Sequence, residues 1–99
     1  MPKRVDASPV MAIIGSHVQS TALSSAVSVT VSAGVTKMYC QAGTKNVRYT
    51  LDGSTAPTAS KGFLLSTSMQ PTIIPVIPGQ VVKFIEVEAS AVLDYQFGV

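Results

Sequence analysis

Charge is what this sequence has least of. Lysine, arginine, aspartate and glutamate make up 12% of its 99 residues, whereas ~25% is usual in soluble domains. Serine and threonine fill the gap, so the surface must be largely hydroxylic or apolar. Protein–protein interfaces are depleted in lysine, glutamate and aspartate, and this composition therefore favours a chain that packs among neighbours. The net charge of +2, carried by scattered basic residues, gives no basis for a nucleic-acid-binding surface.

Covalent and metal cross-links are also missing. The chain has one cysteine, Cys40, and one histidine, His17. A single thiol cannot form an intrachain disulfide, and no second cysteine stands near the histidine to build a zinc site. Neither a metal nor a cofactor is implied. Because a domain of this size buries a modest fraction of its surface, we expect a homo-oligomer, either a trimer or a dimer.

Long apolar runs are absent as well. The segment 73–77 is short and interrupted by Pro75, which is too little to span a membrane. The basic start, Lys3-Arg4, is followed by Asp6 and Pro9, where a signal peptide would continue with apolar residues. We therefore expect neither a signal peptide nor a membrane partner. An unpaired cysteine fits synthesis in a reducing cytoplasm.

Catalytic arrangements are missing too, and we expect no enzyme activity. A glycosidase needs two carboxylates across a cleft, whereas Glu86 and Glu88 share one strand face and are better explained as a solvated surface. A serine hydrolase would need His17 as its base, together with a carboxylate partner and a nucleophile elbow, and no such elbow is present. Cys40 lies within an apolar stretch and is interpreted as a small buried hydrophobe.

The dominant hydrophobic period is two, which is typical of strands whose alternate side chains face a core. Frequent turn signals separate the periodic stretches, and no ten-residue segment favours a helix. The sequence therefore predicts an all-β fold: a single small antiparallel β-sandwich or jelly roll at 10–99. An extended N-terminal arm at 1–9 precedes it. About eight short strands are expected, at Val10–Ile14, Gln19–Leu23, Val27–Val31, Thr36–Gln41, Asn46–Leu51, Thr72–Ile77, Val81–Val87 and Ala91–Phe97.

The alternation also predicts which side chains face inward. In 46–51, Val47, Tyr49 and Leu51 are expected inside, with Arg48 and Thr50 outside. In 81–87, Lys83 and Glu86 are expected outside. The adjacent Phe84-Ile85 breaks strict alternation there, which indicates either a bulge or burial on both faces. Pro78-Gly79 is typical of the centre of a type II turn.

Prolines at 71, 75 and 78 surround the apolar stretch 72–77. Because proline cannot donate a hydrogen bond to a sheet, we expect this strand at a sheet edge. An apolar edge could contact a partner, and the N-terminal arm could reach a neighbour. The alternative is that Ile73, Ile74 and Ile77 simply complete the core. The candidate interface residues are Lys3, Arg4, Val5, Ile73, Ile74 and Pro75.

The stretch from Arg48 to Phe63 is the most distinctive. It contains Arg48-Tyr49-Thr50-Leu51-Asp52-Gly53-Ser54, followed by a hydroxyl-rich loop with Pro57 and Lys61. We expect Asp52 to cap the turn with its own carboxylate and Gly53 to adopt a positive φ. Pro57 is expected to stiffen an exposed loop, and Lys61 to lie in solvent.

This stretch, with Phe84-Ile85 and Tyr95, resembles small virion structural proteins of tailed bacteriophages, which carry an Arg-Tyr-x-x-Asp-Gly-x-x-Pro-Thr pattern midway. The resemblance covers about half of the chain. It implies a β-sandwich or jelly roll that works as a capsid cement or decoration protein and bridges major capsid subunits in the virion, after synthesis in the host cytoplasm. A component of the neck, tail or fibre base is the alternative.

The same pattern is similar to immunoglobulin-like modules appended to chitin-degrading enzymes, which implies a carbohydrate-binding module. Here Thr55-Ala56 adds one residue before Pro57 relative to the commonest form. Such a module needs exposed aromatic platforms, yet tryptophan is absent and alternation turns Tyr49 and Tyr95 inward. Only Tyr39 and the three phenylalanines remain as candidates.

Overall fold

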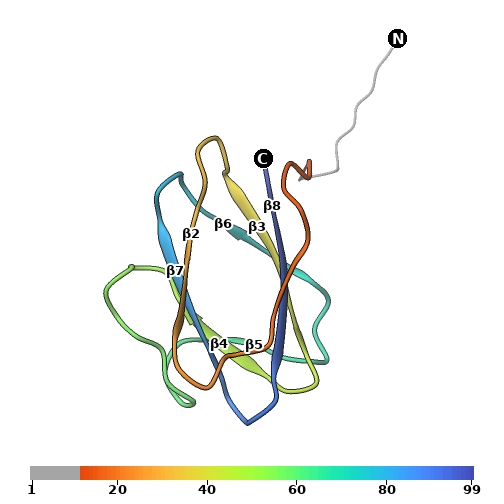
Figure 1. The fold of residues 1–99 in the computed structure, drawn as a ribbon, viewed down its shortest axis with the longest axis vertical. Coiled ribbons are helices and arrows are strands. Elements are labelled where there is room, and N and C mark those ends of the chain that lie inside the picture. Colours follow the sequence, from red (N-terminus) through yellow and green to blue (C-terminus); the bar gives the residue numbers. More distant parts are fainter. Residues whose placement is uncertain (1–11) are drawn as a thin grey trace.

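The computed structural model describes residues 12–99, which form two four-stranded antiparallel sheets packed face to face (Figure 1). This confirms the all-β prediction. Sheet A contains β1, β8, β3 and β6, and sheet B contains β2, β7, β4 and β5, in those orders. The strands are β1 (Val18–Ser20), β2 (Val27–Thr30), β3 (Lys37–Gly43), β4 (Val47–Thr50), β5 (Phe63–Leu65), β6 (Thr72–Pro75), β7 (Val81–Glu86) and β8 (Val92–Gly98).

The strand pairing is that of a jelly roll. β1 pairs with β8, β2 with β7, β3 with β6 and β4 with β5, so the chain resembles one long two-stranded ribbon wrapped into two sheets. Two further pairs, β3–β8 and β4–β7, connect these two-stranded units side by side into the four-stranded sheets. In an immunoglobulin sandwich the first two strands are neighbours in one sheet. Here β1 and β2 belong to different sheets, so the strand order is that of a jelly roll and differs from that of an immunoglobulin sandwich.

Most expected strands are present, with two differences. Within the described residues, the strand expected at Val10–Ile14 is represented by a single bridge between Ile13 and Gly98. The strand β5 was not expected, because only three residues at the end of a hydroxyl-rich loop form it. The N-terminal arm, 1–9, with Lys3, Arg4 and Val5, lies outside the described residues.

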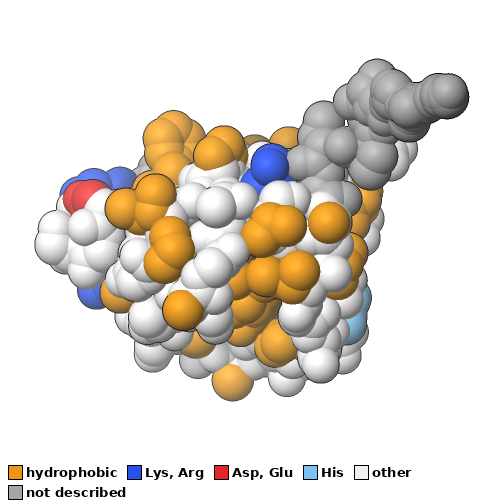
Figure 2. Space-filling model, turned by 90° about the horizontal axis from the view of Figure 1, so that it is seen from above, with side chains coloured by type: hydrophobic (Ala, Val, Ile, Leu, Met, Phe, Trp, Pro, Cys, Tyr) orange, Lys and Arg blue, Asp and Glu red, His pale blue; other side chains and the backbone are white. Residues whose placement is uncertain are grey.

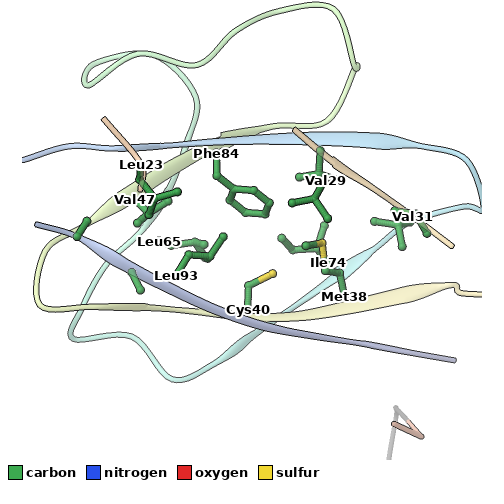
Figure 3. Close-up of a cluster of buried hydrophobic side chains, with 14 of the residues drawn as sticks. Leu23, Val29, Val31, Met38, Cys40, Val47, Leu65, Ile74, Phe84 and Leu93 are labelled. Atoms are coloured by element: carbon green, nitrogen blue, oxygen red, sulfur yellow. The ribbon is translucent and has the colours of Figure 1, made fainter. Parts of the chain in front are cut away.

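The core fills the space between the two inner faces (Figure 3). Phe84 lies near its centre, is fully buried and stacks on Tyr95 of the opposite sheet with ring centroids 6.5 Å apart. Cys40 is 1% exposed, and burial raises the pKa of its thiol to about 12. The interpretation of Cys40 as a buried hydrophobe is confirmed. The other buried apolar residues include Leu23, Val29, Val31, Met38, Val47, Leu65, Ile74, Val82 and Leu93.

Two details of β7 differ from the alternation prediction. Its pairing with β2 and β4 runs without an extra residue, so Phe84-Ile85 forms no bulge. Ile85 is half-buried on the outer face, opposite Arg48. Of the two alternatives, β7 therefore has the second, burial on both faces. Glu86 pairs with the buried Val47. It therefore shares the inner-face parity of Phe84, and the prediction that it faces outward with Lys83 is wrong.

The turn at Pro78-Gly79 has the expected type II features. Gly79 has a φ of 85°, and the amide of Gln80 donates to the carbonyl of Ile77 at 3.1 Å. The strand β6 is the last in sheet A, next to β3 alone. Its expected position at a sheet edge is therefore confirmed.

The core predicts a sharp difference between two phenylalanines. Phe84→Ala should lower the free energy of unfolding by about 3–5 kcal/mol, because it leaves a cavity between the sheets. If that variant does not fold, Phe84→Leu should still lose about 1–2 kcal/mol. Phe63→Ala is the control, because Phe63 is 61% exposed and its loss should cost less than about 1 kcal/mol. Urea denaturation measures all three, and equal losses at the two positions would contradict this core.

Candidate contact surfaces

The loop between β4 and β5 folds back over the outer face of sheet B. Arg48 donates from Nε to the carbonyl of Ala59 at 3.0 Å and from Nη1 to the carbonyl of Gly62 at 2.9 Å. Thr50 donates from Oγ1 to the carbonyl of Thr55 at 2.6 Å. Both side chains point outward as expected, but the loop covers them, and Thr50 is only 9% exposed. The outward side chains of β4 therefore hold the loop in place, and the loop covers this face of the strand.

Asp52 caps the start of this loop, as the sequence predicts. Its Oδ1 accepts from the amides of Ser54 and Thr55 at 3.0 and 2.8 Å, and its Oδ2 accepts from Oγ1 of Thr55 at 2.6 Å. These hydrogen bonds, led by the one from the Thr55 hydroxyl, lower the pKa of the carboxyl to about 2. Gly53 has a φ of 75°, so its expected positive φ is confirmed.

Pro57 and Lys61 have different surroundings. Pro57 is buried, so the expectation of an exposed stiffening proline is wrong: it packs beneath the loop. Lys61 is exposed, and its backbone exchanges two hydrogen bonds with Thr58 in a tight turn. The loop is held to sheet B at several points, and its tip, 59–61, is exposed.

The residues of the expected edge contact at β6 differ in burial. Ile74 is 2% exposed and lies opposite Met38 in the core, so it is not an interface residue. Ile73 is half-buried on the outer face, opposite Tyr39, and Pro75 is exposed. The alternative that these isoleucines complete the core holds for Ile74 and fails for Ile77, which is 68% exposed.

Four exposed aliphatic residues lie at the end of the sandwich that carries the C-terminus: Ile13, Ile14, Ile77 and Val99, which are 40–68% exposed. We call them the terminal strip. Backbone contacts link them across sheet A, since Ile13 bridges Gly98, the amide of Thr36 donates to Gly98, and that of Val76 donates to Thr36. Figure 2 looks onto this end and shows hydrophobic side chains across it with few charges among them. Sequence reasoning missed the strip, because its members are far apart in the chain.

A second exposed apolar group lies along β5, at the edge of sheet B. Phe63 is 61% exposed and Leu64 is 40% exposed. The ring of Phe63 contacts that of Tyr49, with centroids 5.5 Å apart. The group is smaller than the terminal strip and belongs to a strand of only three residues.

The histidine has a carboxylate partner that the sequence did not reveal. Nε2 of His17 lies 2.9 Å from Oδ1 of Asp94, because β1 and β8 are paired beside it. Among residues 12–99, no serine, threonine or cysteine is hydrogen-bonded to this imidazole. Glu86 ends β7, and Glu88 lies beyond it in an ion pair with Lys45 at 3.3 Å. The described part of the chain holds no group of three metal-ligating side chains.

Comparison with protein families, with curated proteins and with solved structures finds no match to this chain. In the described range, 12–99, no helix is long and apolar enough to cross a membrane.

Two glycines of the loop should differ in their tolerance of a side chain. A Cβ at Gly62 would lie 2.9 Å from the carbonyl oxygen of Tyr49, whereas at Gly53 the nearest atom is 3.5 Å away. Gly62→Ala should therefore cost about 2–4 kcal/mol of stability, and Gly53→Ala about 1 kcal/mol from its positive φ. Lys61→Ala should change stability by less than about 0.5 kcal/mol. Thermal denaturation ranks the three, and a harmless Gly62→Ala would contradict the clamped loop.

The cap also predicts a pH dependence. The folded-state pKa of Asp52 is about 2, below the ordinary value of about 3.9. Its stabilising contribution is therefore complete above about pH 4 and disappears as the pH falls through 2. Asp52→Asn should flatten the loss of stability between about pH 4 and pH 2, as followed by urea denaturation at each pH. An unchanged slope in the variant would show that the cap does not form in solution.

Proposed function

We propose that this protein is a virion structural protein of a tailed bacteriophage, a capsid cement or decoration protein that bridges neighbouring major capsid subunits. The terminal strip is the observation that carries the proposal. Its four aliphatic side chains are exposed although the same molecule buries a well-ordered core. Exposed apolar side chains gathered at one end of a soluble protein are typical of contact surfaces.

The chemistry of the strip fits such a role. Burying one large aliphatic side chain contributes about 1.5–3 kcal/mol. One basic residue, Lys37, lies opposite Gly98 and Pro75 at this end of sheet A, so a partner that covers the strip has to pair with that cation.

The proposed mechanism is mechanical. A cement protein lies over the junction of two capsid subunits and adds buried area that opposes the outward pressure of packaged DNA. The jelly roll suits this task, because its β4–β5 loop is held to the sheet by Arg48 and Thr50. Jelly rolls occur in viral capsid domains and in lectins, but this is an analogy of fold and does not define a function.

Purified virions provide the test. Mass spectrometry should find the protein at a copy number comparable to that of the major capsid protein. A few copies per particle would instead place it in the neck, tail or fibre base. Absence from purified particles would contradict every virion role.

Matched variants identify the contact surface. Ile77→Lys and Ile14→Lys should each weaken binding to capsids that lack the protein by at least about tenfold, because a charge would be buried in an apolar contact. Leu64→Lys is the control, since it changes an equally aliphatic exposed residue on the β5 edge. If Leu64→Lys weakens capsid binding more than Ile77→Lys does, the contact surface lies on the β5 edge and not on the terminal strip. Light scattering tests the accompanying expectation of a dimer or trimer.

A further inference from the structure

A polar surface lies on the outer face of sheet A, away from the terminal strip. Outward-facing residues form two adjacent rows there. One row is Gln19, Asp94 and Gln41, which lie opposite one another across β1, β8 and β3. The next row is Gln96, Tyr39 and Ile73, across β8, β3 and β6. Carboxylate, amide and aromatic groups are thus gathered on one face of one sheet.

A shallow hollow of about 70 Å³ lies between the two rows. Its floor is the Cys40–Tyr95 strand pair, whose side chains belong to the core. The rim is formed by His17, Tyr39, Gln41, Pro71, Asp94 and Gln96. Because binding pockets for larger molecules measure about 300–1,000 Å³, this hollow admits only one polar edge of a ligand.

Asp94 is the organised centre of this hollow. Its side chain is 26% exposed, and its Oδ1 accepts from Nε2 of His17 at 2.9 Å and from Nε2 of Gln19 at 3.2 Å. Two side chains thus hold the carboxylate in place. No residue in 12–99 donates a hydrogen bond to its Oδ2.

Two neighbouring groups are also available for a ligand. Gln96 donates from Nε2 to the carbonyl of Gly15 at 3.2 Å, and this bond fixes its amide while its oxygen remains an acceptor. Tyr39 is 38% exposed and presents an aromatic surface beside the acceptors.

We propose that this hollow binds a neutral pyranose sugar. Adjacent hydroxyl groups of the sugar donate to Asp94 and exchange hydrogen bonds with the amides of Gln41 and Gln96, while the ring lies against Tyr39. Amides and hydroxyls both donate and accept, and they outnumber the single carboxylate here, so a neutral hydroxylated ligand fits better than a cation. Asp94 repels anionic ligands. This site is separate from the contact surface of the proposed function, and each can fail without the other.

The test is a titration of the full-length ¹⁵N-labelled protein with methyl glycosides of glucose, galactose, mannose and N-acetylglucosamine, followed by amide chemical shifts. At least one glycoside should produce saturable shifts confined to β3, β8 and the residues around His17. Its Kd should be about 1–10 mM, because so shallow a site buries little of one ring. Absence of saturable shifts with all four, or shifts confined to another surface, would overturn the proposal.

Variants then test the residues. Tyr39→Ala and Asp94→Asn should each weaken binding at least about tenfold, whereas Tyr39→Phe should retain most of it because the ring remains. Phe63→Ala is the matched control, an exposed aromatic residue on the other sheet, and should bind normally. Gln41→Ala replaces Asp94→Asn if that variant misfolds. Binding that survives both Tyr39→Ala and the loss of a polar group, or tighter binding of N-acetyl-arginine methylamide than of any glycoside, would overturn the sugar site.

Discussion

The fold depends on its last two strands. β7 and β8 occupy interior positions in the two sheets, where each is hydrogen-bonded on both sides. Phe84 on β7 stacks on Tyr95 of β8 across the sandwich, so the same two strands also join the sheets through the core. β1 pairs with β8 alone and β2 with β7 alone, so neither can join a sheet before these last two strands have folded. Contacts between such distant parts of a chain make folding slow but give a closed, cooperative structure.

This architecture leaves the surface divided into regions of different chemistry. The outer face of β4 in sheet B is covered by the loop that Arg48 and Thr50 hold. The outer face of sheet A carries amides, Tyr39 and the Asp94 carboxylate. The end with the C-terminus carries the terminal strip. A chain with so few charges suits both proposed surfaces, the apolar contact and the sugar-binding face, because neither depends on a strong electrostatic field.

Local pattern was sufficient for most of the strands, since alternation of apolar and polar residues reports directly on a half-buried sheet. It failed where a distant segment changed the environment of a residue. Thr50 has the expected direction but is buried because Thr55 and its neighbours fold over it. Pro57 is buried in the same way. Ile74 was expected at an edge contact, yet it lies opposite Met38 in the β3–β6 pair, and both side chains point into the core. β5 is too short to have a period.

By itself, the sequence determined the all-β class, the buried thiol, the Asp52 cap and the Pro78-Gly79 turn. Each depends on residues adjacent in the chain or on a period of two, so their physical causes are local. Only the tertiary structure decided the jelly-roll pairing, the partnership of His17 with Asp94 and the assembly of the terminal strip from Ile13, Ile77 and Val99. Those features depend on residues far apart in the chain, 77 positions in the case of His17 and Asp94, and strand pairing is what brings the segments that carry them to one place.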